Sequence, residues 1–307
     1  MPLHADELAV DTEHAQRLLE RQAPKWAGLP VTPLGATGST NVLFRLGDEL
    51  LLRLPRQPGG GAGIAKEQRW TAELGAALRV AVPEILFVGA PDAGFPEPWS
   101  VVRWIEGRHP VTGETADAAD QATLADGLAD VVGRLAELDV PETARRDPSL
   151  RAYRGGPLRA FDDEFARVVT VCERIPALEL DLDQARRVWS ASLALPGADR
   201  VDRRCWYHGD LVAENLLLAD GELVAVLDFG GLAVGDPTID LHGAWELFGP
   251  DDRSRFRDRL GVDDAQWGRA RAWALGISLG ALAYYWDSLP SRRSDRLVMA
   301  RAAIAGD

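Results

Sequence analysis

Three polar side chains in the second half of the chain are spaced so that they could carry chemistry. Asp210 and Asn215 lie five residues apart on one loop, and a hairpin then returns a second carboxylate, Asp228. The acid can face a substrate hydroxyl while the amide faces a metal ion. Carboxylate and amide oxygens, when few, suit Mg²⁺ that also keeps water and nucleotide phosphates as ligands. The pattern indicates phosphoryl transfer, in which positioning and charge neutralisation provide most of the catalysis.

Each of these residues alone is also a common turn former, so the elements around them decide the interpretation. An apolar strand ending at Tyr207 leads into the loop, and strands over 216–218 and 223–227 follow it, separated by Asp220-Gly221. An Asp-Gly pair between apolar runs is a strong hairpin signal. The combination of loop and hairpin favours one functional unit over three unrelated turns.

The first third of the chain has the pattern of a small sheet with one covering helix. Strands are predicted over 41–46, 49–54, 82–88 and 99–105, and a first helix over 12–23 begins at Asp11 as its N-cap. A second helix ends near residue 78 and places Glu67 on the same face as apolar side chains. We expect the glycine cluster at 59–63, before that helix, to be a flexible connector.

The pattern changes to helix from residue 115 onward. Apolar side chains recur at helical spacing up to residue 138, and further helices are predicted over 157–175, 182–195 and from 237 to the end. The 307 residues suit two lobes, which we expect at 1–106 and 107–307.

Three motifs resemble the aminoglycoside phosphotransferase family, which includes macrolide kinases. They are the segments 208–215, 227–230 and 235–241, which read HGDLVAEN, LDFG and GDPTIDL. The resemblance implies an α+β, protein-kinase-like fold with a small antiparallel-sheet N-lobe and a larger, mainly helical C-lobe. The N-lobe would bind the nucleotide and end in a hinge, and the C-lobe would hold the catalytic loop, the metal and the acceptor.

The resemblance also implies roles for individual residues. Asp210 would be the catalytic base, Asn215 and Asp228 the Mg²⁺ ligands, and ATP or GTP the phosphate donor. Asp236 would brace the catalytic loop, a role compatible with its position as a helix N-cap before Pro237.

The chain departs from the kinase pattern at the phosphate-binding cation. Protein kinases carry a lysine on the third strand, paired with a glutamate on the next helix. Here the matching residue is Arg53, and Glu67 is its natural partner because a charge on an apolar face needs a counter-charge. The two lysines, Lys25 and Lys66, are badly placed for the role. The alternative is that Arg53 and Glu67 form a surface pair.

Two further segments of the N-lobe are candidates for nucleotide contacts. The loop over 35–41 fits neither common glycine-rich phosphate motif, but backbone amides near Ser39 and Thr40 could cradle phosphate. By resemblance, the backbone at Arg103 and Ile105 is the hinge that would pair with the adenine edge.

The acceptor is expected against the helical lobe, over 161–172 and 245–286. Candidate contacts for ammonium groups are Asp240, Glu246 and Asp287, and aromatic residues such as Tyr284 could contact apolar rings, although core packing is the alternative for each of them.

Three functions are compatible with this reading. The first is a kinase that phosphorylates a hydroxyl of an aminoglycoside or macrolide antibiotic and confers resistance. The second is a metabolic kinase of a small alcohol, amino alcohol or sugar. The third is a nucleotide-binding pseudoenzyme, against which the intact Asp210, Asn215 and Asp228 argue.

Composition excludes other classes. A net charge of −13 repels nucleic acid and anionic membranes and favours cationic partners. Two distant cysteines, Cys172 and Cys205, provide neither a disulfide framework nor a zinc site, so we expect free thiols in the cytoplasm. The least polar run, over 272–286, is shorter than a membrane span and is predicted to be a buried helix.

Overall fold

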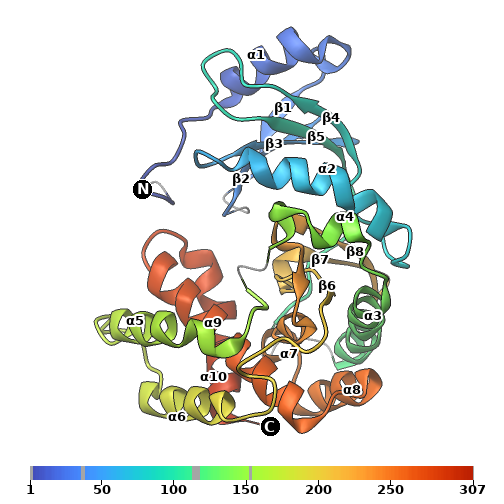
Figure 1. The fold of residues 1–307 in the computed structure, drawn as a ribbon. Helices are drawn as coiled ribbons and strands as arrows, with labels where there is room; N and C mark the ends of the chain where they lie inside the picture. Colours follow the sequence, from blue (N-terminus) through green and yellow to red (C-terminus); the bar gives the residue numbers. More distant parts are fainter. Residues whose placement is uncertain (1–2, 36–38, 113–117, 152–153, 307) are drawn as a thin grey trace. The chain divides into compact units, whose positions relative to one another are not determined.

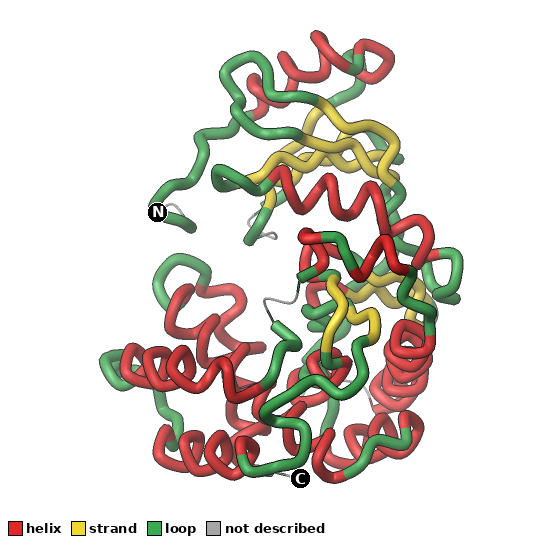
Figure 2. The backbone as a smooth tube through the Cα atoms, viewed as in Figure 1, coloured by secondary structure: helices red, strands yellow, loops and turns green. Residues whose placement is uncertain are grey.

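The computed structural model describes residues 3–35, 39–112, 118–151 and 154–306, which form two compact units (Figures 1 and 2). The N-terminal unit comprises Met1–Ala76, Ala81–Glu106 and Ala225–Gly230. The C-terminal unit comprises Ala77–Val80, Gly107–Val224 and Gly231–Asp307. Each unit is described by itself.

The N-terminal unit is built on an antiparallel sheet of five strands. Its strand order is β1-β2-β3-β5-β4, with β1 at Val31–Pro33, β2 at Asn41–Leu46, β3 at Leu50–Pro55, β4 at Ile85–Gly89 and β5 at Trp99–Arg103. The register pairs Arg53 with Leu43 on β2 and with Ser100 on β5. Arg53 therefore lies on the central strand, where both neighbours fix its position.

Two helices pack on this sheet. Helix α1 (Thr12–Gln22) contacts β1, and α2 (Gly61–Gly75) contacts β5. Asp11 caps α1 by accepting a hydrogen bond of 2.8 Å from the His14 N–H. The core of the unit includes Leu18, Leu52 and Trp99, none of which is exposed to solvent.

The C-terminal unit is mainly helical. Its helices are α3 (Ala118–Glu137), α4 (Glu142–Arg145), α5 (Asp162–Cys172), α6 (Leu182–Leu193), α7 (Ala244–Leu247), α8 (Pro250–Leu260), α9 (Asp264–Tyr285) and α10 (Arg293–Ala305). Helix α9 packs against α5, α6 and α10, and a capping box between Asp263 and Gln266 fixes its start.

Short strands of the unit lead into and out of the candidate loop. Strand β6 (Cys205–Tyr207) pairs antiparallel with β9 (Ala233–Gly235). Strands β7 (Leu216–Ala219) and β8 (Glu222–Val226) form the expected hairpin. Asp220 and Gly221 both have positive φ, +51° and +82°, as a tight hairpin turn requires.

The predicted fold class is confirmed, with differences in detail. The glycine cluster is not a connector: Gly61 begins α2, and a Cβ there would lie 2.4 Å from Pro98. Helix α9 starts earlier than the predicted 272, and the predicted helix over 157–175 begins as a 3₁₀ segment, Leu158–Phe161. Residues 115–117, where the C-lobe helices were expected to start, lie outside the described residues.

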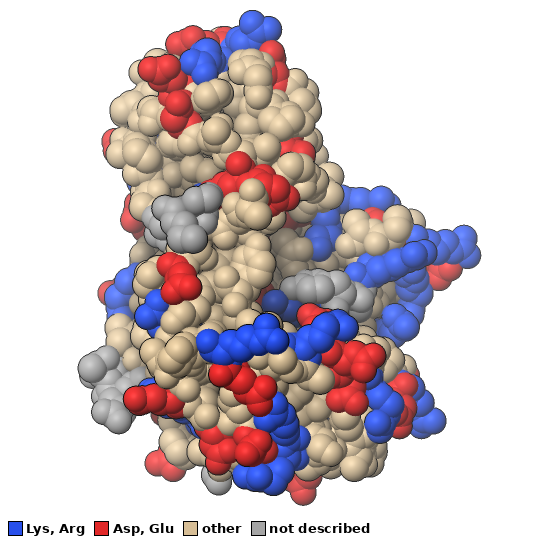
Figure 3. Space-filling model, turned by 90° about the vertical axis from the view of Figure 1, so that its left-hand side faces the viewer, with Lys and Arg blue, Asp and Glu red and all other residues tan. Residues whose placement is uncertain are grey.

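Opposite charges are intermixed on the surface. Figure 3 shows Lys and Arg side chains beside Asp and Glu side chains in the lower part of the drawn face. Ion pairs from Arg255 to Asp126 (2.5 Å) and from Arg259 to Asp130 (2.9 Å) join α8 to α3. Pairs as exposed as these stabilise a fold little.

Two further observations concern the predicted buried helix over 272–286 and the predicted free cysteines. In the described part of the chain, no helix is long and apolar enough to cross a bilayer. Cys172 and Cys205 are free and buried.

Candidate active site

Asp210 and Asn215 contact each other directly in the C-terminal unit. The Asn215 amide nitrogen donates hydrogen bonds to the Asp210 carbonyl oxygen (2.8 Å) and to the Asp210 Oδ2 (3.0 Å). A 3₁₀ turn over Ala213–Asn215 makes this contact possible because it turns the loop back on itself. The structure thus brings together the acid and the amide that the spacing predicted.

The Asp210 carboxylate and the Asn215 amide oxygen are the groups predicted to contact a substrate hydroxyl and a metal ion. Asn215 is buried, whereas the Asp210 side chain is 34% exposed and can meet a substrate. Because the Asn215 nitrogen is bound to Asp210, its amide oxygen, which accepts no hydrogen bond from the described residues, is available to a metal ion.

Asp240 holds the start of the candidate loop over 208–215. Its two carboxylate oxygens accept hydrogen bonds from the backbone N–H groups of His208 (2.7 Å) and Gly209 (2.6 Å). Gly209 has a φ of +86°, which a side chain would strain. Asp240 is 1% exposed with both oxygens occupied, so the expectation that it contacts the acceptor is wrong.

Asp236 was expected to brace the loop, but its contacts lie elsewhere. It caps the 3₁₀ helix Pro237–Leu241 by accepting from the Thr238 N–H (3.1 Å), and it lies 3.4 Å from the Arg269 guanidinium. The N-cap position is as predicted. The bracing contact to the loop is made by Asp240, four residues further on.

Glu246 is also an internal support of the loop. Its Oε1 accepts a hydrogen bond of 2.9 Å from the Ala213 N–H, and its Oε2 pairs with Arg296 of α10. Arg296 also contacts Glu214, at 3.1 Å. Glu246 is 2% exposed and its charge is neutralised by Arg296. Its predicted contact with an ammonium group of the acceptor is therefore wrong.

The other two acceptor candidates lie at the surface. Tyr284 is 57% exposed and packs edge-to-face with Tyr285, with ring centroids 4.6 Å apart. Asp287 is exposed just beyond the end of α9. Both remain candidates for contact with an acceptor.

In the N-terminal unit, Arg53 pairs with Glu67 as expected. The two side chains are buried and in direct contact, and the Arg53 Nε donates to the Ser100 hydroxyl (3.2 Å). The alternative of a surface pair is wrong. Burial disfavours the charged guanidinium, but the carboxylates of Glu67 and Asp228 outweigh it and raise the pKa of Arg53. Arg53 is therefore a permanent cation.

Asp228 lies in the same unit with an unusual backbone. Its φ is +57°, a left-handed conformation that costs a non-glycine residue about 1–3 kcal/mol. Its Oδ1 accepts a hydrogen bond of 3.2 Å from the Gly230 N–H. Lys66, which sequence reasoning set aside, donates to the Gly230 carbonyl oxygen. The turn that carries Asp228 is thus fastened to α2.

The remaining nucleotide candidates are partly engaged. The Ser39 and Thr40 carbonyl oxygens accept from His4 (2.8 Å) and from the Arg56 N–H (2.9 Å), and residues 36–38 of the same loop lie outside the described residues. The Arg103 N–H already donates to the Glu84 carbonyl oxygen at 3.0 Å. Ile105 lies just beyond β5 and bonds to no other described backbone group.

The described residues contain no cluster of three or more His, Cys, Asp or Glu side chains that could hold a metal ion. A magnesium ion bound to the described residues would therefore need nucleotide phosphates and water among its ligands. Mg²⁺ at phosphoryl-transfer sites is commonly bound in this way.

The sequence profile of a phosphotransferase enzyme family matches residues 30–273, which is most of the chain. The chain belongs to this family. It is accordingly an enzyme of the kinase type, and its three recognised motifs fall within the matched residues.

Solved structures similar to this phosphotransferase share its fold. They include the GDP complex of aminoglycoside 2'-phosphotransferase-IIIa (19% identity, TM-score 0.72, 96% of this chain and 99% of that one) and ADP-bound aminoglycoside phosphotransferase APH(2'')-Ib (16%, 0.62, 96% and 99%). Another is macrolide 2'-phosphotransferase MphH from Brachybacterium faecium (22%, 0.62, 97% and 98%). No curated protein matches the sequence.

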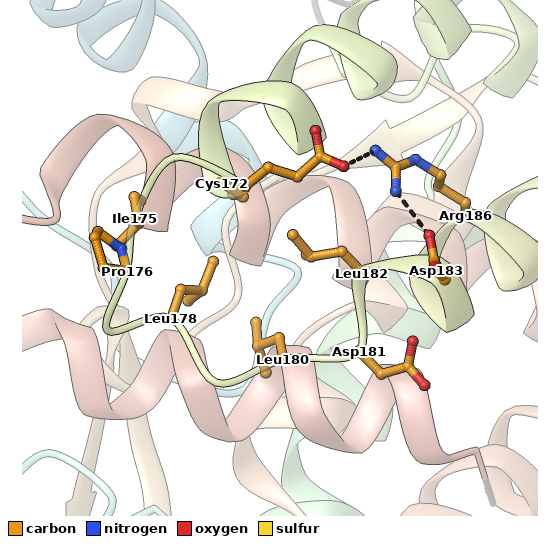
Figure 4. Close-up of a pocket in the computed structure, with 10 residues that line it drawn as sticks. Cys172, Ile175, Pro176, Leu178, Leu180, Asp181, Leu182, Asp183 and Arg186 are labelled. Atoms are coloured by element: carbon orange, nitrogen blue, oxygen red, sulfur yellow. Dashed lines mark hydrogen bonds and ion pairs between the residues drawn. The ribbon is translucent and has the colours of Figure 1, made fainter.

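The phosphotransferase has a surface hollow of about 450 Å³ between α5 and α6 (Figure 4). Ile175, Leu178 and Leu180 line it, and Arg186 at its edge pairs with Glu173 (2.5 Å) and Asp183 (3.0 Å). The only predicted acceptor segment it includes is the end of α5. None of the residues predicted individually to bind nucleotide, metal or acceptor lines this hollow.

The Arg53–Glu67 pair allows a test by double-mutant cycle. If Arg53 binds the nucleotide phosphates, as the sequence predicts, Arg53→Ala should raise the KM for nucleotide about 10-fold or more and lower kcat. Arg53→Lys should keep part of the function, since a point charge replaces the fork. Glu67→Ala should give a milder defect, and the double variant should be little worse than Arg53→Ala. Additive losses, or a wild-type nucleotide KM in Arg53→Ala, would contradict the assignment.

His242 provides a test of the buried support behind the loop. It is fully buried, its Nδ1 donates to the Ile239 carbonyl oxygen, and burial lowers its pKa from the ordinary 6.5 to about 4. Between these values the unfolded chain binds a proton that the folded chain does not. The contribution of His242 to the free energy of unfolding should therefore fall as pH decreases from 6.5 to 4, by about 3 kcal/mol at most. Glu214 and Asp240, whose pKa burial raises to about 7, contribute with the opposite sign in this range, so the effect is measured as the difference between wild type and a His242 variant.

Urea unfolding at pH 7 and pH 4.5 measures this effect. His242→Gln should lose less stability than the wild type between the two pH values, because the titrating group is absent. His109→Gln, a change at an exposed histidine of the same unit, is the control and should behave like the wild type. Equal pH dependence in wild type and His242→Gln would show that His242 is not held neutral.

Proposed function

We propose that this phosphotransferase transfers the γ-phosphate of ATP or GTP to a hydroxyl group of an antibiotic of the aminoglycoside or macrolide type, and thereby confers resistance. The observation that carries the proposal is the loop in which Asp210, held by Asn215 and by the backbone contacts of Asp240, presents a carboxylate to solvent. Similar folds named as aminoglycoside and macrolide phosphotransferases, two of them with GDP or ADP bound, support the choice of substrates.

In this proposal Asp210 orients the acceptor hydroxyl and takes its proton. The acceptor oxygen bonds to the γ-phosphorus while the bond from that phosphorus to the β–γ bridging oxygen breaks, and the nucleoside diphosphate leaves. Burial alone would raise the pKa of Asp210, but the guanidinium groups of Arg154 and Arg296 outweigh it and lower this pKa. The carboxylate is therefore ionised at neutral pH and ready to accept a proton.

The Asn215 amide oxygen and the Asp228 carboxylate would hold Mg²⁺. When bound, the ion would neutralise charge on the phosphate oxygens. Both donors are hard oxygen atoms, as Mg²⁺ prefers.

Residues 1–106 would bind the nucleotide and 107–307 the acceptor. Arg53 would face phosphate oxygens, and the backbone amides near Ser39 and Thr40 would cradle them. The hinge backbone at Arg103 and Ile105 would pair with the adenine edge, with Ile105 the better placed because the Arg103 N–H is already bonded. The reaction would take place in the cytoplasm, where nucleoside triphosphate is supplied.

A specific observation keeps the second candidate function open. Two of the three carboxylates expected to bind ammonium groups, Asp240 and Glu246, are buried and already bonded. An acceptor with few or no ammonium groups needs fewer such contacts. A metabolic kinase of a small alcohol, amino alcohol or sugar fits this observation, as does a macrolide kinase.

An acceptor panel distinguishes these functions. Nucleotide consumption by the purified enzyme is measured with aminoglycosides, macrolides, sugars and amino alcohols, with ATP and with GTP. A strain expressing the enzyme is tested in parallel for antibiotic susceptibility, with a strain expressing Asp210→Asn as the control. Transfer to an antibiotic together with raised resistance supports the proposal. Transfer only to a metabolite favours the second function, and nucleotide binding without transfer to any acceptor or to water would indicate a pseudoenzyme.

A further inference from the structure

Arg154 contacts the carboxylate on which the proposed reaction depends. Its guanidinium Nη1 lies 3.4 Å from the Asp210 Oδ1, the oxygen opposite the one bound by Asn215. The Arg154 side chain is 29% exposed and the Asp210 side chain 34%, so both can be reached from solvent. No sequence motif singled out Arg154, because it lies far from Asp210 in the chain.

The backbone carbonyls of Arg154 and of the next residue, Gly155, are both hydrogen-bonded. The Tyr207 hydroxyl donates to the Arg154 carbonyl oxygen, and the Asp236 N–H donates to the Gly155 carbonyl oxygen at 2.7 Å. Gly155 has a φ of +68°, and a Cβ there would lie 2.8 Å from the Tyr207 ring. Both partners flank the candidate site, since Tyr207 directly precedes the catalytic loop and Asp236 follows β9. These two hydrogen bonds tie the backbone at Arg154 and Gly155 to the elements that flank the candidate loop.

The distance to Asp210 places Arg154 near the reacting atoms. An acceptor hydroxyl bound to Asp210 must come within about 3–3.5 Å of the phosphorus it attacks. Any phosphoryl group that reaches this hydroxyl therefore also comes within reach of a guanidinium that already contacts the same carboxylate. The transferring phosphoryl group comes within reach of the Arg154 guanidinium wherever the rest of the nucleotide lies.

We propose that Arg154 is a phosphate-binding residue, which turns from Asp210 to the transferring phosphoryl group and stabilises the charge on its oxygens. The inference rests on the proposed function, and it adds a residue to the reaction without changing the chemical step. Arg154 keeps its protons throughout, while the hydroxyl proton goes to Asp210 and the nucleoside diphosphate leaves. A planar fork of N–H donors suits two phosphate oxygens better than a point charge does.

The competing explanation is that Arg154 only keeps Asp210 ionised. In that case its removal would shift the acidic limb of the pH–rate profile and leave the rate on the plateau unchanged. If Arg154 binds phosphate, the plateau rate itself falls. The two explanations therefore differ at pH values well above the pKa of Asp210.

The test compares Arg154→Ala, Arg154→Lys and Arg151→Ala with the wild type. Arg151 is an exposed arginine of the same segment, so its removal changes the net charge equally. Nucleotide hydrolysis with water as the acceptor is measured first, and transfer to an identified acceptor second. Arg154→Ala should lower the plateau kcat about 100-fold or more, with nucleotide KM changed little, because arginines on a transferring phosphoryl group contribute at least this much.

The matched variants and a chemical rescue complete the test. Arg154→Lys should recover part of the rate, added guanidinium ion should partly restore Arg154→Ala, and Arg151→Ala should match the wild type. A plateau kcat within about twofold of wild type in Arg154→Ala, a shift of the acidic limb alone, or a rise in acceptor KM alone would overturn the inference and leave the proposed function intact. A wild-type enzyme that turns over no nucleotide would overturn both.

Discussion

Asp210→Asn should lower kcat by about 10³-fold, because the asparagine cannot take the proton of the acceptor hydroxyl. The change is nearly isosteric, and the new amide oxygen can still accept the hydrogen bond that Asn215 donates to Oδ2. The loop geometry should therefore persist and nucleotide binding should remain. Steady-state kinetics and a nucleotide-binding titration of the same preparation measure the two effects separately.

Asp202→Asn is the matched control for this experiment. Asp202 is an exposed aspartate a few residues before β6, so its replacement removes the same charge without touching the loop. Its kcat and melting temperature should equal those of the wild type. Turnover within about tenfold of wild type in Asp210→Asn would contradict the assignment of the base, and loss of nucleotide binding in that variant would assign Asp210 to the nucleotide.

The parts of the site carried by local patterns could be predicted from the sequence. The Asp220-Gly221 turn fixes the hairpin after the loop, since both residues adopt the positive φ that their types allow. The pair Arg53–Glu67 followed from one charge on a central strand and one on the apolar face of a helix. The kinase pattern, in which a lysine on the third strand pairs with a glutamate on the next helix, indicated the two positions, and a charge on an apolar face needs a counter-charge.

The supports of the loop depended on long-range geometry that no local pattern contains. Asp236 and Asp240 belong to the same short segment, and both are acidic residues near a 3₁₀ helix. Which of the two reaches the His208 and Gly209 amides is decided by the path of the chain after β9. The Pro237 signal correctly located an N-cap, but it gave no information on contacts outside the segment.

At Glu246 the local sequence does contain a signal for burial. It lies in the run Ala-Trp-Glu-Leu-Phe, where an acid among apolar residues points to burial with a paired cation as readily as to an open site. Its partner Arg296 is fifty residues away on α10. The pairing could not be read from spacing, although the burial could have been.

The contacts of two cations, Arg154 and Lys66, also could not be predicted from local sequence patterns. The backbone at Arg154 is fixed by the Tyr207 and Asp236 contacts, and Lys66 reaches the Gly230 carbonyl oxygen across a large separation in sequence. Unlike Arg53, neither residue matches a position of the kinase pattern, so nothing local in the sequence distinguishes it. Only the folded geometry places these two beside Asp210 and beside the Asp228 turn.

Asp228→Asn should weaken Mg²⁺-dependent nucleotide binding by about tenfold or more and lower kcat further, because it replaces a charged metal ligand with a neutral one. Asparagine is the informative substitution here. Asp228 has a φ of +57°, and asparagine tolerates the left-handed region at least as well as aspartate does. Alanine would add backbone strain to the loss of the ligand and confuse the two effects.

The control for this change has the same backbone conformation. Asp220 has a φ of +51° and is exposed at the hairpin turn, so Asp220→Asn tests the conformational cost without a metal ligand. Nucleotide binding is titrated calorimetrically over a range of Mg²⁺ concentrations. Asp228→Asn should need more Mg²⁺ for half-maximal binding, and binding measured without Mg²⁺ should not weaken, because removing a negative charge near the phosphates does not disfavour them. If the Mg²⁺ dependence is unchanged, Asp228 is not a metal ligand, and its left-handed backbone serves only the turn that Lys66 fastens to α2.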